Sequence, residues 1–370
     1  MDYLYYSDLT DKSLRGEIFS DEICSDILTS SKIELLLLLH AAYQVRQQAA
    51  GKEVSIHIIN NAQNGFCPED CHYCAQAKTS DAAIEDYPLK QEEEILAEAK
   101  RAYESGAFRY CMVFAGRGPS PRRIDFLSKM VMEIKKHYPI QVCISAGLIN
   151  EDGAQKLKKA GLDRLNHNLN TSERNYPNIC TTHTFQDRLN TLSAAKHAGI
   201  ELCSGMIVGM GEDHTDVIEV AKNLRRLKVK SIPVNFLVPI EGNKLQEISN
   251  LTPEYCLRIL CLYRFLNPDS ELRVAAGREG HLRSMEVMAL YPANSLFLDG
   301  YLNTKGSSRA KTLRMIKDAG FTINSDQSLE KLLLEEENDA KTFKIDDSYF
   351  FMKDLKDLRP QLNNQLTAKS

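Results

Sequence analysis

Three cysteines within eight residues are the part of this sequence with the clearest chemical meaning. Cys67, Cys71 and Cys74 stand in the run Cys-Pro-Glu-Asp-Cys-His-Tyr-Cys. Three thiolates at this spacing can hold three corners of an iron-sulfur cube, and no fourth cysteine follows at the short spacing of a ferredoxin. One iron would then lack a protein ligand. An open metal position indicates chemistry, because a purely structural site closes its coordination shell.

Two other uses of cysteine fit the sequence less well. Structural zinc sites normally show two separated ligand pairs, and no second pair follows Cys74 at finger-like spacing. Ten cysteines in 370 residues, behind a polar start without signal-peptide features, predict a reducing cytosol rather than a disulfide framework. We interpret four remaining thiols as ordinary part-buried residues: Cys24, Cys180, Cys256 and Cys261.

Composition limits the partners of the chain. The net charge is −4 and no dense basic patch is present, so the sequence gives no support for a nucleic-acid partner. The longest apolar run, residues 33–42, is well short of the roughly 20 residues of a membrane span. We expect that run to belong to a packing helix over residues 31–48. It would lie in an N-terminal helical extension, residues 1–50.

The next segment, from residue 51 to 325, alternates short apolar runs with amphipathic stretches, which predicts repeated strand-helix units. Eight strands are expected, over residues 55–60, 110–115, 141–145, 164–168, 201–208, 232–238, 271–275 and 295–298. Intervening helices are expected over residues 91–105, 123–137, 151–160, 186–198 and 215–227, and from Thr252 onward. Eight units over about 250 residues favour an α/β fold of the (β/α)8 TIM-barrel type. The competing open doubly wound sheet would be expected to show an early Gly-x-Gly-x-x-Gly turn, which is absent.

Four strand residues could form a second metal site inside such a barrel. Cys111, Cys143, Cys203 and Arg273 each lie within a predicted strand, where side chains alternate between lumen and exterior. If all four face inward, three thiolates and a guanidinium converge. Buried cysteines are usually small core residues. An inward arginine without an anionic partner is costly, however, so Arg273 favours a buried charged object.

A row of amides would line the same region. Asn166, Asn168 and Asn170 alternate along one face, and Asn235 stands inside an otherwise apolar strand. Buried amides need hydrogen-bond partners, which favours a bound ligand rich in donors and acceptors. The glycines of residues 205–211 would let the backbone approach that ligand closely.

Together these residues resemble the biotin synthase family of radical S-adenosylmethionine (SAM) enzymes, over about residues 50–310. The matching motifs are the three-cysteine loop, Arg109-Tyr110-Cys111, Asn166 to Ser172, Cys203-Ser204-Gly205, Pro233-Val234-Asn235 and Arg273 to Glu279. The three-cysteine loop alone would indicate only the superfamily. The lumen cysteines, Arg273 and the asparagine row indicate this family within it.

The resemblance implies a sulfurtransferase for the last step of biotin biosynthesis. A 4Fe-4S cluster on Cys67, Cys71 and Cys74 would bind SAM and generate a 5′-deoxyadenosyl radical. A 2Fe-2S cluster on Cys111, Cys143, Cys203 and Arg273 would give sulfur to dethiobiotin. The implied SAM contacts are Tyr73, Asn168, Asn170, Gly205, Ile207 and Val238, and the implied dethiobiotin contacts are Asn166 and Asn235. A cytoplasmic homodimer, served by an electron donor such as flavodoxin or ferredoxin, is also implied.

Some features depart from the family pattern or leave alternatives open. Position 170 is asparagine where other members carry aspartate, and Cys180 could be a spare thiol near the barrel mouth or an alternative ligand. Residues 326–370 lie beyond the resemblance, with a helix expected over 330–337 and disorder over 361–370. One competing function is another radical enzyme, such as a maturase-type relative or a lipoyl synthase, although the latter should show a second cysteine triplet. The other is a non-catalytic iron-sulfur or zinc protein.

Overall fold

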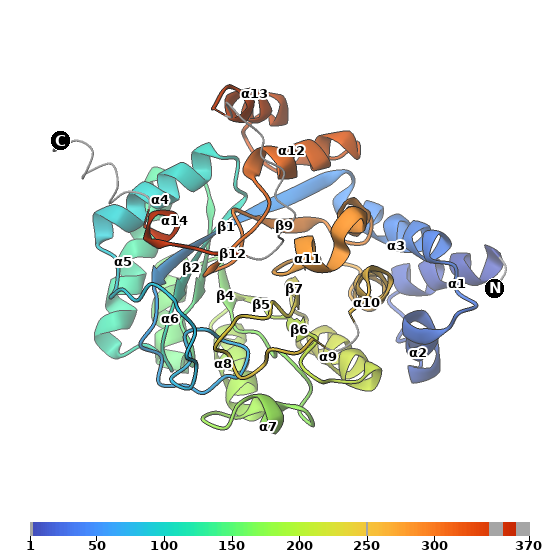
Figure 1. Cartoon of the computed structure of the whole chain (residues 1–370), viewed down its shortest axis with the longest axis horizontal. Helices are drawn as coiled ribbons and strands as arrows, with labels where there is room; N and C mark the ends of the chain where they lie inside the picture. The colour runs from blue at the N-terminus through green and yellow to red at the C-terminus, as the bar shows by residue number, and fades with distance from the viewer. Residues whose placement is uncertain (1–2, 249–250, 340–350, 360–370) are drawn as a thin grey trace.

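The expected barrel forms the centre of the molecule (Figure 1). The structure is a computed structural model that describes residues 3–248, 251–339 and 351–359. The barrel strands are β1 (Glu53–Gln63), β2 (Arg109–Phe114), β3 (Gln141–Ser145), β4 (Arg164–Asn166), β5 (Glu201–Cys203), β6 (Met206–Val208), β7 (Ser231–Phe236), β8 (Glu271–Val274) and β9 (Ser295–Leu298). All pairings among them are parallel, and β9 pairs back with β1 to close the sheet. Since β5 and β6 share one position, the eight-stranded prediction is confirmed.

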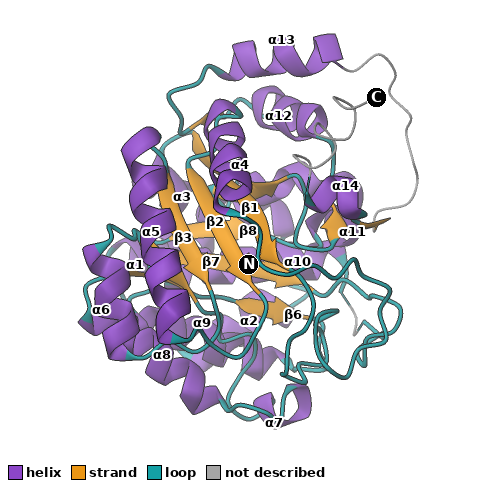
Figure 2. Cartoon of the chain, turned by 90° about the vertical axis from the view of Figure 1, so that its left-hand side faces the viewer, coloured by secondary structure: helices purple, strands orange, loops and turns teal. Residues whose placement is uncertain are grey.

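Helices surround the strands, as Figure 2 shows from the side. They are α4 (Glu92–Glu104), α5 (Pro121–His137), α6 (Glu151–Lys159), α8 (Phe185–His197), α9 (His214–Leu227), α10 (Pro253–Leu266) and α11 (Arg278–Leu282), followed by the 3-10 helix η1 (Arg283–Leu290). Most of the longer ones begin at a side chain that accepts a hydrogen bond from the first turn. Thr184 and Asp213 do so within complete capping boxes. No helix in the described ranges is both long and apolar enough to cross a membrane.

The N-terminal extension differs from its prediction. The helix expected over residues 31–48 is α3 (Leu35–Ala50), which begins later because Glu34 is extended and makes no side-chain cap. Two further helices precede it, α1 (Tyr3–Leu14) and α2 (Asp21–Thr29). Helix α3 packs between α1 and α10, so this extension covers the outside of the barrel.

The strand expected over residues 201–208 is broken, which is a correction of the prediction. The break falls at Gly205, where a Cβ atom would lie 1.8 Å from the carbonyl oxygen of Pro233. Only glycine permits that approach of two backbones. The preceding strand is also shorter than expected and ends at Asn166. The chain then turns at Asn170, which has a φ of 70°, and the backbone N–H of Asn170 donates to the carbonyl of Gly205.

The C-terminal segment returns to the barrel. Strand β11 (Thr322–Ile323) pairs with the start of β1, after helix α12 (Arg309–Asp318). Helix α13 (Leu329–Asp339) covers the helix expected over 330–337. Strand β12 (Phe351–Met352) then pairs with β10 (Thr304–Lys305), and α14 (Leu355–Leu358) lies beside α4 (Figure 1). The disorder expected over 361–370 lies outside the described residues.

Candidate active site

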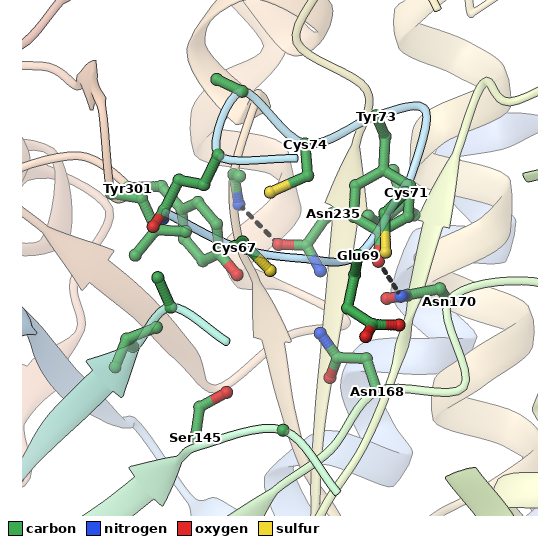
Figure 3. A pocket seen from close by; sticks show the side chains of 18 of the residues that line it. Cys67, Glu69, Cys71, Tyr73, Cys74, Ser145, Asn168, Asn170, Asn235 and Tyr301 are labelled. Atoms are coloured by element: carbon green, nitrogen blue, oxygen red, sulfur yellow. Dashed lines mark hydrogen bonds between the residues drawn. The ribbon is translucent and has the colours of Figure 1, made fainter. Parts of the chain in front are cut away.

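The three-cysteine loop follows β1 and faces a cavity of about 260 Å³. Two tight turns shape it, because Cys74 donates its amide to the carbonyl of Cys71, and Ala77 donates to that of Cys74. Cys67, Cys71 and Cys74 all line the cavity, and Figure 3 shows their sulfur atoms with Asn168 and Ser145 beyond them. The loop therefore presents three thiols to one open space.

The asparagine row lines the same cavity. Asn166 Nδ2 donates to Asn168 Oδ1 at 3.1 Å, and that oxygen also accepts the amide of Gly205 at 3.1 Å. Asn170 Nδ2 donates to the hydroxyl of Tyr73 at 2.5 Å (Figure 3). These bonds fix the amides in a defined orientation before any ligand arrives.

The other residues implied for ligand contact lie around this row. Ile207 and Val238 line the cavity, as does Asn235. The Asn235 amide already bonds two backbone groups, because its Nδ2 donates to Met206 and its Oδ1 accepts from Ala276. Gly205 is not among the lining residues. It contributes through its hydrogen bond to Asn168 and its packing beneath the row.

The lumen places Cys111, Cys143, Cys203 and Arg273 around a second, smaller cavity. Cys111 and Cys143 are directly opposite on β2 and β3, and the three cysteines form one buried contact group. Hydrogen bonds from Cys143 lower the pKa of Cys111 and Cys203 well below the usual range and raise that of Cys143. Arg273 Nη1 lies 3.9 Å from Cys203 Sγ. All four residues thus face inward together.

Glu271, which the sequence analysis did not single out, lies below these thiols. Its carboxylate contacts four buried basic groups: His57 Nε2 at 2.9 Å, Arg109 Nη1 at 3.0 Å, Arg164 Nη1 at 2.9 Å and Arg273 Nη2 at 2.7 Å. Burial opposes its ionisation, but the charge of Arg109 and the hydrogen bond from His57 hold the pKa of Glu271 well below its usual range. The sequence did contain a sign of this residue, because Glu271 is a charged residue at the start of a predicted barrel strand.

Glu271 changes the interpretation of Arg273. Arg273 was expected to lack an anionic protein partner, and that expectation was wrong, because Glu271 pairs with it. The group around Glu271, here called the floor of the lumen, still carries an excess of positive charge. Its three guanidinium groups face two carboxylates, the buried Glu271 and the half-exposed Glu201 that contacts Arg164. His57 adds none, since burial lowers its pKa and favours the neutral ring. An anionic thiolate set above this floor would balance that excess.

Cys180 is not the ordinary part-buried thiol that was expected. It caps the short helix α7 (Tyr176–Ile179), is 2 % exposed, and its Sγ lies 3.8 Å from Cys71 Sγ. His183 Nδ1 is 3.3 Å from the same sulfur. The hydrogen bond from Cys71 lowers the pKa of Cys180 to about 4, against the effect of burial. Long-range folding makes this group, since more than 100 residues separate the two thiols in sequence.

The two sets of donors fit the iron-sulfur groups that the family resemblance implies. Cluster ligation needs deprotonated thiols, and the lowered pKa values favour them at Cys111 and Cys203. The pKa of Cys143 is raised in the same hydrogen bonds, so its deprotonation depends on the positive charge of the floor and on the metal itself. The loop supplies three thiols around an open cavity with free space for a ligand on the fourth iron. Burial opposes the charge of Arg273, but Cys203 and Glu271 raise its pKa and keep it charged here. A charged guanidinium has no lone pair to give to iron, so Arg273 fits the fourth ligand position only after losing a proton.

Comparisons with known proteins identify the family of the chain. Residues 64–249 match the model of the Radical SAM superfamily, and residues 233–322 match the Biotin and Thiamin Synthesis associated domain. The chain is 55 % identical to biotin synthase of Magnetococcus marinus, over 85 % of this chain and 98 % of that protein. It is 44 % identical to biotin synthase of Bacillus subtilis, over 89 % of this chain and 98 % of that one.

Solved structures support the fold. The FeFe-hydrogenase maturase HydG from Carboxydothermus hydrogenoformans superposes with a TM-score of 0.74 at 19 % identity, covering 89 % of this chain and 81 % of that one. Methylornithine synthase gives 0.73 at 21 % identity, covering 87 % and 98 %. At this identity the two structures establish the barrel alone. The sequence matches go further, and the chain belongs to the biotin synthase family of the radical SAM superfamily.

Proposed function

We propose that this enzyme converts dethiobiotin to biotin by radical SAM sulfur insertion, the last step of biotin biosynthesis. Membership of the family supports the reaction class. The structural support is the arrangement of two thiol sets, one at the barrel mouth and one in the lumen. A single-cluster radical enzyme would need only the first.

The observation that carries the proposal is that the two cavities share a wall. Val113, Ser145, Asn166, Asn168 and Tyr301 line both of them. A small substrate held against that wall lies between the loop thiols and the lumen thiols. Reaction at an alkyl carbon requires this kind of placement, because radical and sulfur donor must reach the same atoms in turn.

The cofactors supply the difficult chemistry, as they do in enzymes that act on unactivated carbon. Cys67, Cys71 and Cys74 would hold a 4Fe-4S cluster, which with SAM would supply the 5′-deoxyadenosyl radical, and the lumen residues would hold a 2Fe-2S cluster, which would supply sulfur. The lumen residues are Cys111, Cys143, Cys203 and Arg273. No side chain is needed as an acid or base for hydrogen removal.

The protein side chains position the two small molecules. We assign Tyr73, Asn168, Asn170, Ile207 and Val238 to SAM, with Gly205 acting by orienting Asn168. Asn166 and Asn235 would bind the ureido ring of dethiobiotin. They would use the side-chain donors and acceptors that their hydrogen bonds within the protein do not occupy. Asn170 uses its Nδ2 on Tyr73, so its Oδ1 is oriented to accept a hydrogen bond from a ribose hydroxyl.

We further propose that the enzyme acts as a cytoplasmic homodimer and receives electrons from a donor such as flavodoxin or ferredoxin. In the same proposal, residues 1–50 form an extension, 51–325 the catalytic barrel and 326–370 a C-terminal segment. Size-exclusion chromatography with light scattering tests the dimer, and reduction of the enzyme by each purified donor tests the electron source.

Anaerobic reconstitution tests the central proposal. Iron and sulfide analysis with Mössbauer spectroscopy should show two cluster types, and adding SAM should change the spectrum of the 4Fe-4S cluster alone. Turnover with dethiobiotin should then deplete the 2Fe-2S signal as biotin forms. A protein that takes up one cluster type, or zinc alone, would contradict the proposal and favour the competing functions.

A further inference from the structure

Cys71, Cys180 and His183 form a group that the proposed reaction does not use as a unit. All three are buried, and one potential ligand atom from each lies within 4.8 Å of the others. Cys71 comes from the loop after β1, whereas Cys180 and His183 follow α7. Because two separate segments converge, the group is a product of the fold rather than of local sequence.

The spacing of the two sulfur atoms matches a tetrahedral metal ion. Two thiolates bound to zinc at about 2.3 Å in tetrahedral geometry lie about 3.8 Å apart. The observed distance between Cys71 Sγ and Cys180 Sγ is 3.8 Å. A sulfur and an imidazole nitrogen on the same ion lie about 3.5 Å apart, and Cys180 Sγ is 3.3 Å from His183 Nδ1.

A fourth oxygen donor is also at hand. Glu69 Oε2 contacts His183 Nδ1 at 2.5 Å, and this hydrogen bond must break when Nδ1 binds a metal. The carboxylate then keeps its bonds from Arg117 Nη1 at 3.2 Å and from Thr182 Oγ1 at 2.7 Å, and it must turn toward the ion to complete the coordination. Asp70 is less suitable, although Cys180 Sγ lies 3.2 Å from its Oδ1. The backbone amides of Thr181 and Thr182 already donate to Oδ1, and the Thr181 hydroxyl donates to Oδ2.

The opposite ring nitrogen of His183 is already held. Arg188 Nη2 lies 2.9 Å from Nε2 and fixes the ring plane. Arg188 is itself held by a hydrogen bond to the carbonyl of Asn168 at 2.8 Å and by another to Tyr176. Because arginine can only donate, Nε2 accepts in its contact with Arg188, and Nδ1 carries the proton that Glu69 accepts. An ion at Nδ1 requires that the proton move to Nε2, so the contact between Arg188 and Nε2 opens on binding while Arg188 keeps its bonds to Asn168 and Tyr176.

We propose that Cys71, Cys180 and His183, with Glu69 as fourth donor, bind a single thiophilic divalent cation such as zinc when the 4Fe-4S cluster is absent. The inference rests on the proposed function in one respect, namely that Cys71 is otherwise a cluster ligand. One thiolate cannot serve both arrangements, so the single-ion site and the cluster exclude each other. Zinc held there keeps the chain from accepting the cluster until the ion is removed.

Cobalt(II) provides the test, because it binds at zinc sites and absorbs light there. Its charge-transfer absorption shows whether thiolates are ligands, and its ligand-field absorption shows the coordination geometry. Cluster-free full-length protein is titrated anaerobically with cobalt alone and then with zinc as competitor. We expect one tetrahedral ion per chain. Cys180→Ser and His183→Gln should each weaken binding at least tenfold, and Cys180→Ser should also lower the charge-transfer intensity.

Cys67→Ala and Cys74→Ala are the matched controls. Both remove a loop thiol but leave the proposed ligands, so cobalt affinity should equal that of the wild type. Loss of binding in these two variants with retention in Cys180→Ser would place the ion on the loop triplet and overturn the proposal. Circular dichroism confirms folding, and Cys180→Ala replaces the serine variant if that one does not fold.

The two proposals fail separately. Cobalt binding is measured before any cluster is assembled, whereas SAM cleavage is measured on reconstituted wild-type protein. Cobalt on Cys180 without SAM cleavage would contradict the proposed function alone. SAM cleavage together with cobalt on Cys67 and Cys74 would contradict this site alone. Zinc added before reconstitution should also slow cluster uptake, and a chelator should relieve that effect.

Discussion

Glu271 is the residue on which the charges of the lumen floor converge. It contacts His57 and three arginines, and Ser231 Oγ donates to it at 2.8 Å. Removing one partner of a buried ion pair costs more than the pair contributes, because the remaining charges stay buried without compensation. Cluster-free protein should therefore depend on this carboxylate for its stability.

Replacing Glu271 by glutamine tests that dependence. We expect Glu271→Gln to lower the free energy of unfolding by about 3–5 kcal/mol. Glu201→Gln is the matched control, because Glu201 contacts the same Arg164 at 2.8 Å but its side chain is 51 % exposed. Its loss should cost less than about 1 kcal/mol. Urea denaturation of cluster-free protein measures both, and equal effects would contradict the central role of Glu271.

The two thiol sets should separate in their effects on the reaction. Cys71→Ala leaves two loop cysteines, which should not hold the cube, so SAM cleavage should be lost. Cys143→Ala should leave cleavage measurable while biotin formation collapses. Chromatographic assay of 5′-deoxyadenosine and biotin in the same samples checks both. Biotin formed normally by Cys143→Ala would rule out the lumen thiols as holders of the sulfur source.

At the level of helices and strands, local sequence patterns were enough to predict most of the barrel. The strands at residues 141–145 and 295–298 match the structure at both ends, because compact apolar runs mark them. The break at Gly205 could not be predicted, since it depends on contact with Pro233 in the next strand. The contact of Cys180 with Cys71 and the role of Glu271 could not be predicted for the same reason: the partners are far apart in sequence and meet only in the folded chain.

The C-terminal strap, residues 351–359, is an element outside both family matches, which end at residues 249 and 322. Its strand β12 pairs with Thr304 and Lys305, and the amide of Lys353 donates to the carbonyl of Asn303 at 2.5 Å. Asn303 and Thr304 line the larger cavity. The strap thus holds the loop that forms one side of the site.

The far end of the strap is fixed to the barrel helices. Lys90 Nζ donates to the carbonyl of Leu358 at 2.5 Å, and Arg359 forms an ion pair with Glu94 at the start of α4. An ion pair between Lys305 Nζ and Asp357 Oδ2, at 2.9 Å, joins β10 to the strap. These contacts secure both the strap and the loop it supports.

Shortening the chain tests the strap. A protein ending at Asp339 lacks it, and we expect the KM for SAM and dethiobiotin to rise several-fold with a smaller change in kcat. The physical reason is that an unsupported loop must be ordered when the ligands bind. A protein ending at Arg359 keeps the strap and is the control. Equal KM values in the two proteins would show that the loop at residues 303–304 needs no support.

Over the whole molecule, the two thiol sets differ in their access to solvent. Cys67 and Cys74 are partly exposed at the mouth and Cys71 is 8 % exposed, whereas the three lumen thiols, Cys111, Cys143 and Cys203, are 7 %, 1 % and 2 % exposed. The lumen set is enclosed by the barrel strands and lies deeper than the shared wall. Small reagents must therefore pass the mouth before they reach it.

This difference predicts the order in which metal is lost. A water-soluble iron chelator added to anaerobically reconstituted enzyme should remove the 4Fe-4S iron several-fold faster than the 2Fe-2S iron, because the mouth cluster has an open position and solvent access. Mössbauer spectra taken during chelation distinguish iron of the 4Fe-4S cluster from iron of the 2Fe-2S cluster.

SAM should slow the loss of iron from the 4Fe-4S cluster, because it occupies the open iron, and it should leave the rate of iron loss from the 2Fe-2S cluster unchanged. In urea-unfolded protein both rates should become equal. Faster loss from the lumen in folded protein would mean that the barrel opens at its base, contrary to the closed β1–β9 pairing.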